Sequence, residues 1–251
     1  MKRLEKIWYL KHFDIFKDLT DREIDVIDRI SYMKHYKRRE RIYGQGDPGD
    51  LVYLLKEGRV KIYKLSPDGK ELTLAVLENG EIFGEMALID EGPRGTIAET
   101  LDDSDICVIR RRDFEMLLKK KPDLALHVTK LIGLRRREIE NQLENLVFRN
   151  APSRLAALLM SLAEKYGVRD SQGIILNVKL SQQELANLIG TARETTSALL
   201  NEFKRLGFID IRHRRIKILE QWQLKKIADA KMKEFPIKEV DREEDSEAVV
   251  Q

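Results

Sequence analysis

Short runs of alternating or β-rich residues fill the N-terminal half of the chain and predict strands. Four such runs stand out, at residues 51–55, 60–65, 72–77 and 106–109. The segment Ser66-Pro67-Asp68-Gly69 predicts a hairpin turn between two of them, because proline presets one turn dihedral and glycine accepts the other. Many short strands at this spacing favour a β-barrel or β-roll. A short helix over residues 21–31 precedes them, and Thr20 and Glu23 form a capping box at its start.

The period changes after Asp113, and residues 122 to about 150 predict one long helix. Ile132, Ile139 and Leu146 are seven residues apart, which is the heptad spacing of paired helices. The stripe is too narrow for a helix buried on several sides, so we expect it to pair with the same helix of a second chain. The alternative is that it packs on the β-domain of its own chain. The full stripe is Leu124, Val128, Leu131, Ile132, Ile139, Leu143 and Leu146.

A second unit begins at residue 151 and extends to about residue 220. An Ala- and Leu-rich helix over residues 152–166 ends at Gly167, which we interpret as its C-cap. Residues 174–178 predict a short strand.

The segment LSQQELANLIGTARETTSALLNEFKRLGFIDI, residues 180–211, predicts two helices joined by a short turn. Ser181 and Glu184 form a capping box, Gly190 permits the turn, and Thr191 is placed to cap the second helix. This is the signature of a helix-turn-helix, whereas a generic helical hairpin is the alternative. The apolar residues of the two helices are Leu185, Ala186, Leu188 and Ile189, then Leu199, Leu200, Phe203 and Leu206.

The opening turn of the second helix carries polar residues where a helix that only packs would begin its apolar stripe. Arg193 can donate two hydrogen bonds to guanine O6 and N7, and Glu194 can accept one from the amino group of cytosine. Thr195 and Ser197 reach phosphates or thymine methyl groups, and Thr196 belongs to the same polar run. The predicted DNA-binding residues are Ser181, Gln183, Thr191, Arg193, Glu194, Thr195, Ser197, Arg212 and Arg214.

Two of those residues belong to a hairpin that follows Gly207, with strands over residues 208–212 and 215–219. Its tip is basic, so we interpret the hairpin as a wing that neutralises phosphates, and the alternative is a solvated surface hairpin. The basic residues of the tip are Arg212, His213, Arg214 and Arg215, with Lys217 just beyond.

Charge is distributed unevenly along the 251 residues, whose formal net charge is +3. Residues 236–251 hold six acidic and two basic residues, a balance of −4, so residues 1–235 carry +7. The basic part suits an anionic partner, and the acidic tail is expected to be disordered. The longest stretch without a charged residue, residues 155–163, is too short to span a membrane.

The single cysteine, Cys107, excludes an intramolecular disulfide, a cysteine-based zinc finger and a four-cysteine iron–sulfur cluster. It sits in an apolar strand, so we expect it in the core. With one cysteine, a cytoplasmic location is the default expectation. No nucleophile–base or metal-ligand set is visible, so we predict that the chain is not an enzyme. The four histidines are scattered: His12, His35, His127 and His213.

The order of β-roll, long helix and winged helix-turn-helix resembles the CRP/FNR family of bacterial transcription regulators over about residues 10–220. LSQQELANLIGTARETTSALL is close to the family's recognition segment, and FGEMALIDEGPRGT, residues 83–96, is similar to the phosphate-binding cassette of cyclic-nucleotide-binding domains. The stretch ENLVFRNAPSRLAALLMSLA, residues 144–163, matches the family's hinge and following helix.

The resemblance implies an effector site in the roll. Gly84 would let the backbone approach a ligand, Glu85 would bond a ribose hydroxyl, and Arg94 would pair with a cyclic phosphate such as that of cyclic AMP. The alternative is that these residues merely shape a short helix and its ion pair. The predicted effector residues are Gly84, Glu85, Met86, Ala87, Arg94, Gly95, Thr96 and Glu140.

The chain departs from the family pattern in three places. Cyclic-nucleotide binders of the family carry Ser or Thr and then Ala after the arginine, whereas here Gly95 comes first and Thr96 one place late. The Thr-Ser pair that faces adenine in the cyclic AMP receptor corresponds to Ile139 and Glu140, and a third base-reading arginine corresponds to Ala198. A vestigial, effector-independent pocket therefore stays open as an alternative. Haem sensing is not expected, because His12, His35 and His127 are interpreted as surface residues.

The predicted fold class is α+β: a jelly-roll-like β-roll, a dimerisation helix and a winged helix-turn-helix. The predicted domains are residues 1–121, 122–150 and 151–235, followed by the tail 236–251.

The predicted function is that of a homodimeric regulator that binds a pseudo-palindromic operator in double-stranded DNA, with RNA polymerase as a further partner if it activates transcription. A rotation at the hinge, residues 149–152, would couple effector to DNA. An effector-binding subunit that acts through protein contacts is the alternative of another class.

Overall fold

The computed structural model describes residues 9–10, 13, 16–89, 92–178, 180–212 and 215–229. His12, His213, Arg214 and the acidic tail therefore lie outside the described residues. The chain divides into two compact units, one comprising Met1–Leu143 with Ser181–Thr195 and the other Glu144–Leu180 with Thr196–Gln251.

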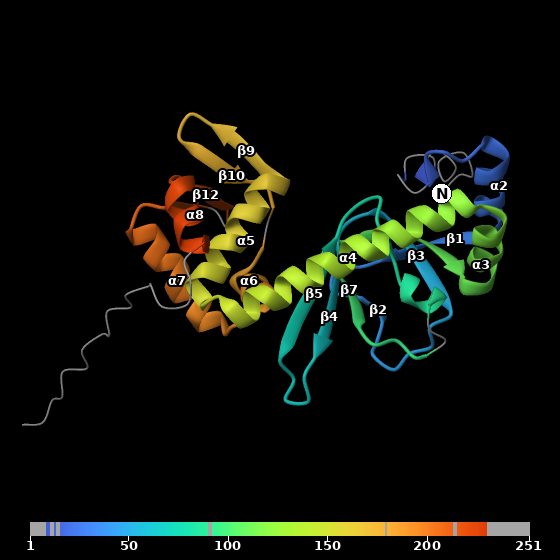
Figure 1. Ribbon diagram of the computed structural model, residues 1–251, viewed down its shortest axis with the longest axis horizontal. Coiled ribbons are helices and arrows are strands. Elements are labelled where there is room, and N and C mark those ends of the chain that lie inside the picture. Colours follow the sequence, from blue (N-terminus) through green and yellow to red (C-terminus); the bar gives the residue numbers. More distant parts are fainter. Residues whose placement is uncertain are drawn as a thin grey trace, which may run out of the picture. The chain divides into compact units, whose positions relative to one another are not determined.

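Two four-stranded antiparallel sheets form the β-roll of the first unit (Figure 1). The hairpin turn predicted at Ser66–Gly69 joins β4 to β5, and the amide of Lys70 donates to the Ser66 hydroxyl at 3.0 Å. In the order of the sheets the strands are β1 (Ser31–Tyr36), β8 (Ser104–Arg110), β3 (Leu51–Glu57) and β6 (Ile82–Phe83), then β2 (Arg41–Tyr43), β7 (Ile97–Thr100), β4 (Val60–Leu65) and β5 (Glu71–Leu77).

The first sheet is buried on both faces, which explains the continuous apolar runs in β3 and β8. Val52 and Leu54 face one apolar cluster, and the intervening Tyr53 and Leu55 face the other, as alternation along a strand requires. Cys107 pairs in register with Leu54 and is 1 % exposed, which confirms its predicted place in the core.

Helices cover the outer face of this sheet. The helices of this unit include α2 (Asp21–Ile30), η2 (Glu85–Leu88), α3 (Arg111–Lys120), the first part of α4 (Pro122–Phe148) and α6 (Gln182–Ile189). The predicted capping box of α2 is confirmed, since the Thr20 amide donates to the Glu23 carboxylate at 2.8 Å. Ile27, Phe114 and Leu124 reach from three helices into one buried cluster with the sheet, and the helices thereby close the outer face.

The apolar stripe of α4 divides into two parts with different surroundings. Leu124 and Val128 are buried against the β-domain, so the alternative interpretation holds for the start of the helix. Ile139 and Leu143 are 42 % and 59 % exposed, so the later part of the stripe lies open. The heptad interpretation therefore concerns only this later part.

The second unit combines helices with the four-stranded sheet β11–β12–β10–β9 (Figure 1). The predicted hairpin is confirmed as β11 and β12, while β9 and α8 were not predicted. Leu155, Leu159, Phe203, Ile218 and Leu224 are at most 1 % exposed and form its core. Its elements are α5 (Ala151–Tyr166), β9 (Gly167–Asp170), β10 (Gly173–Leu176), the greater part of α7 (Arg193–Arg205), β11 (Ile209–Arg212), β12 (Arg215–Ile218) and α8 (Gln221–Asp229).

Gly167 follows α5 as predicted, but the reason for glycine differs. Its φ of −74° and ψ of 129° are extended, so it is not the left-handed cap that the sequence suggested. A Cβ atom at Gly167 would lie 2.2 Å from the carbonyl oxygen of Ala163. Close approach of the strand to the helix end therefore requires glycine here.

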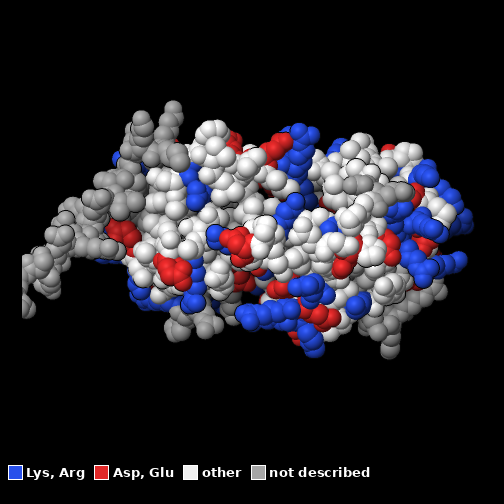
Figure 2. Space-filling view, turned by 90° about the horizontal axis from the view of Figure 1, so that it is seen from below, with Lys and Arg blue, Asp and Glu red and all other residues white. Residues whose placement is uncertain are grey.

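Charged residues form separate patches on the face of the molecule shown in Figure 2. Lys and Arg gather over the end of the first unit that carries α2 and α3 (Figure 2). Within the part of the chain that the structure describes, no helix could cross a membrane and no group of His, Cys, Asp and Glu could hold a metal ion.

Candidate functional site

The β-roll contains a pocket of about 470 Å³, a size typical of small-molecule sites. All eight residues that the sequence assigned to an effector line it: Gly84, Glu85, Met86, Ala87, Arg94, Gly95, Thr96 and Glu140. They come from η2, the segment before β7, and α4, so the fold unites residues that lie far apart in the sequence. Tyr43, Phe83 and Ile132 add apolar wall.

Gly84 shapes the floor of the pocket through its backbone conformation. It adopts a left-handed φ of 72° directly before η2. A Cβ atom there would lie 2.9 Å from Tyr53 Cδ2 and 3.0 Å from Arg94 Nη1. Glycine is therefore required both by the dihedral and by the two side chains that press against it.

Arg94 is 7 % exposed and held by partners within its own unit. Its Nη1 atom donates to the carbonyl oxygen of Gly84 at 2.9 Å, and its Nη2 atom donates to that of Leu51. The guanidinium lies over the ring of Tyr43, 4.5 Å from its centroid. Among the described residues, the buried Nε atom has no hydrogen-bond partner. Arg94 thus lines the pocket with one donor unsatisfied, an Nε atom that is itself shielded from solvent.

Arg135 is a pocket residue that sequence reasoning missed. Its Nη1 atom lies 3.0 Å from Glu85 Oε1, and its Nη2 atom donates to the carbonyl oxygen of Ile82 at 2.6 Å. Glu85, predicted to bond a ribose hydroxyl, is therefore paired with an arginine of α4 in this structure. The sequence did offer a signal for Arg135. It lies three residues after Ile132 and four before Ile139, and residues at these spacings share a helix face.

Aromatic side chains make the inner wall of the pocket weakly polar. The rings of Tyr53 and Phe83 stack with centroids 4.9 Å apart, and Tyr43 lies beside both. Burial raises the pKa of the Tyr43 hydroxyl, although its hydrogen bond with Thr96 and the nearby Arg94 act in the opposite direction. Tyr43 is therefore a neutral hydroxyl that touches two predicted effector residues.

The predicted helix-turn-helix is present as α6 (Gln182–Ile189), the turn 190–192 and α7. The capping box is confirmed: the Glu184 amide donates to the Ser181 hydroxyl at 3.2 Å, and the Ser181 amide donates to the Glu184 carboxylate at 2.5 Å. Gly190 has the left-handed φ of 62° that the turn needs.

Thr191 does not cap α7, contrary to the prediction. The helix begins at Arg193, two residues later, and the Thr191 amide donates to the carbonyl oxygen of Ala186 at 3.0 Å. Thr191 therefore closes the end of α6.

The opening turn of α7 presents its polar side chains to solvent. Arg193, Glu194 and Thr195 are exposed, and Ser197 is half-buried. Thr196 is fully buried, so the polar run is not uniformly available as predicted, and the core face of α7 begins at this residue. At the other end, Leu206 is 41 % exposed and not a core residue.

The remaining predicted DNA contacts lie on α6 and on the wing. Ser181 and Gln183 are exposed, and Gln183 Nε2 donates to Asn187 Oδ1 at 2.8 Å. Arg212 is exposed on β11, and its Nε atom lies 2.6 Å from Asp210 Oδ2. Arg212 is therefore steadied by a carboxylate, while Arg214 lies outside the described residues.

Comparison with known proteins supports both halves of this description. Residues 33–121 match the cyclic nucleotide-binding domain family, and residues 153–227 match the Crp-like helix-turn-helix domain family. The Cyclic AMP receptor protein of Thermus thermophilus is 32 % identical over 219 residues, which cover 87 % of this chain and 98 % of that protein. The CRP-like cAMP-activated global transcriptional regulator of Mycobacterium tuberculosis is 27 % identical over 210 residues, covering 84 % and 94 %.

A solved structure of a CooA mutant from Carboxydothermus hydrogenoformans is also similar. It superposes with a TM-score of 0.72 at 30 % identity, and the match covers 81 % of this chain and 90 % of that one. These relatives are transcription regulators, not enzymes. The chain, with its β-roll, long helix and helix-turn-helix, belongs to the CRP/FNR family of transcription regulators.

Proposed function

We propose that this regulator is a homodimer that binds a pseudo-palindromic operator and is gated by a nucleotide-like effector in the pocket of the β-roll. The observation that carries the gating is the pocket of about 470 Å³ in which the buried Arg94 Nε atom has no hydrogen-bond partner among the described residues. An arginine that lines an open pocket and has no ion pair among the described residues suits an anionic ligand, whose charge its guanidinium would balance.

The exposed later part of the α4 stripe supports the dimer. Ile139 and Leu143 stand in d and a positions of a heptad, where apolar side chains pack against a partner helix. Two symmetric copies of the exposed Arg193–Thr195 turn would then read half-sites about 34 Å apart. Such a regulator acts in the cytoplasm, and RNA polymerase is its further partner if it activates transcription.

The dimer is tested by Leu143→Glu, with Leu134→Glu as a matched control. Both leucines are exposed, at 59 % and 58 %, but Leu134 lies off the stripe at the outward-facing position of the heptad. We expect light scattering to show a dimer for the control and a monomer for Leu143→Glu. If both variants were dimers, the later part of the α4 stripe would not be the dimer interface.

The operator is tested by selecting duplexes from a random pool with the purified chain. We expect two inverted half-sites whose centres are about 10 base pairs apart, because two symmetric recognition helices face the same side of the duplex. A single unrepeated half-site would contradict the homodimer model of recognition.

The effector is tested by calorimetry with cyclic AMP, cyclic GMP and 2-oxoglutarate. We expect a cyclic nucleotide to bind and Arg94→Lys to weaken it, because lysine keeps the charge but lacks the planar fork that matches two phosphate oxygens. Pairing of Glu85 with Arg135 favours the second candidate, a vestigial pocket in which Glu85 already has a partner from the protein. Absence of binding by all three compounds would support that candidate.

The third alternative, in which the C-terminal domain is only a protein-docking module, loses support. Residues 153–227 match the Crp-like helix-turn-helix domain, and the opening turn of α7 is exposed rather than packed.

A further inference from the structure

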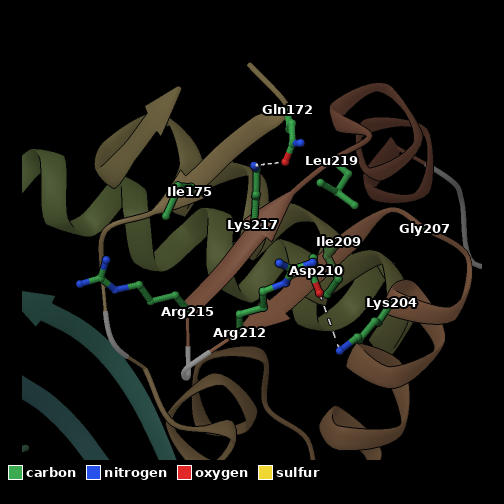
Figure 3. Close-up of a pocket in the computed structure, with 10 residues that line it drawn as sticks. All are labelled: Gln172, Ile175, Lys204, Gly207, Ile209, Asp210, Arg212, Arg215, Lys217 and Leu219. Atoms are coloured by element: carbon green, nitrogen blue, oxygen red, sulfur yellow. Dashed lines mark hydrogen bonds and ion pairs between the residues drawn. The ribbon is translucent and has the colours of Figure 1, made fainter. Parts of the chain in front are cut away.

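A groove of the second unit lies on the wing sheet and beside the end of α7 (Figure 3). It encloses about 970 Å³. Lys204, Arg212, Arg215 and Lys217 give it four cations, and Asp210 gives one carboxylate. Ile175, Ile209 and Leu219 supply apolar lining. The groove therefore combines a basic rim with an apolar floor.

The cations of the groove exceed the carboxylates that balance them. Asp210 is shared, since its carboxylate lies 2.6 Å from Arg212 Nε and 3.7 Å from Lys204 Nζ. Lys217 Nζ lies 2.8 Å from Asp170 and 3.2 Å from the Gln172 side-chain oxygen, which Figure 3 shows beside it. Among the described residues, Arg215 has no ion pair. Even with Asp170 included, two positive charges remain uncompensated.

Residues 236–251 of the same chain complement this groove. They carry a net charge of −4, and valines at positions 240, 249 and 250 stand among the acidic residues. Such a segment offers carboxylates to the rim and apolar side chains to the floor. A DNA backbone, the other anionic occupant, has phosphates and sugars but no branched aliphatic side chains to pack on Ile175 and Leu219.

The covalent connection brings the segment within reach. Leu219 lines the groove and lies two residues before α8, whose nine residues span about 13 Å. Residues 230–235 can bridge up to about 20 Å when extended, which exceeds that helix length. The acidic segment is thus tethered to the unit that carries the groove, and tethering raises its effective concentration there.

We propose that the acidic segment 236–251 binds in the wing-sheet groove of its own chain and competes there with nucleic acid. Its carboxylates pair with Lys204 of α7 and with Arg212 and Arg215 of the wing strands. The contact weakens with salt, because exposed charge pairs are screened. An operator, which binds more tightly, displaces the segment readily, whereas a non-specific duplex competes with it less well.

Spin labelling of the full chain tests the site directly. Cys107 is buried and is the chain's single cysteine, so a label on S246C is selective. We expect a label at position 246 to broaden the amide signals of Lys217 and Leu219 at low salt, and 0.5 M salt to restore them. K204Q/R215Q should abolish the broadening, whereas the control K119Q/K120Q on α3, with the same change of charge, should not. Broadening on α3 or at Arg110–Arg112 instead, or none at all, would overturn the proposal.

Duplex binding gives the second readout. Neutralising the six acidic residues of the segment (E239Q, D241N, E243Q, E244Q, D245N and E247Q) should tighten binding of a non-specific duplex by about 5-fold at low salt, because the competent fraction rises. In that neutralised chain, the melting temperature at low salt should fall slightly, because a contact made only with the folded groove is lost. If the affinity is unchanged, and K204Q/R215Q weakens duplex binding equally in both chains, the groove is a DNA contact and not the site of the segment.

Discussion

The pocket of the β-roll and the opening turn of α7 place their arginines in opposite environments. Arg94 is buried, bonded to two carbonyl oxygens and stacked on Tyr43, so its side chain is part of the framework of the roll. Arg193 is exposed at the start of a helix. The comparison separates a residue whose replacement damages the fold from one whose replacement damages only binding.

The largest effect is expected at Arg94. Arg94→Met keeps most of the side-chain volume but leaves the carbonyl oxygens of Gly84 and Leu51 without their donor, so we expect a loss of about 3 kcal/mol in unfolding free energy. Scanning calorimetry of the full chain would show a lower transition. An unchanged melting temperature would show that Arg94 does not stabilise the fold and that its role is confined to ligand binding.

Arg193→Ala should act on binding and leave stability unchanged. Loss of a guanine contact costs about 1–3 kcal/mol and relaxes base preference at one position. Polarisation titrations on the selected operator measure it. Arg205→Ala, at the far end of the same helix, is the control, since Arg205 pairs with Glu202 on the surface. Equal losses from both variants would show that charge alone, and not base reading, is responsible.

Gly84→Ala tests whether the backbone conformation at the pocket, like the side chain of Arg94, contributes to the stability of the fold. A left-handed φ of 72° costs a residue with a Cβ atom about 1–2 kcal/mol, and here the new atom also meets Tyr53. Gly95→Ala is the matched control, because no atom lies within 4 Å of its added Cβ. Thermal unfolding should separate the two variants. If they melt alike, Gly84 carries no strain.

The smallest effect is expected at Asp170 in the wing sheet. The hydrogen bond from Lys217 and then the backbone amide of Gln172 lower the pKa of Asp170 below its ordinary value of 3.8. A lowered pKa in the folded state gives stability that is fully present above pH 3.8 and is lost as pH falls through the folded value. Asp170→Asn should therefore melt slightly lower at neutral pH and match the natural chain in strong acid. A constant difference at all pH values would contradict this.

Local signals in the sequence determined the elements that depend on neighbouring residues. The capping boxes at Thr20 and Ser181, the left-handed turn at Gly190 and the strands of the wing all follow from interactions within a few residues, and all were predicted. Apolar runs in β3 and β8 likewise predicted strands, because a sheet buried on both faces needs them.

The tertiary structure decided what depends on distant partners. Glu85 meets Arg135 fifty residues later, and Arg94 reaches Leu51 forty-three residues earlier, so neither pairing has a local signal. Thr196 is buried because the helix rotates it inward, although its polarity resembles that of its neighbours. The sequence thus determined eight of the residues that line the pocket, without Arg135, and the polar residues that open α7. Packing decided which of them stay free to bind, because burial and long-range hydrogen bonds are set only when the sheets and helices close on one another.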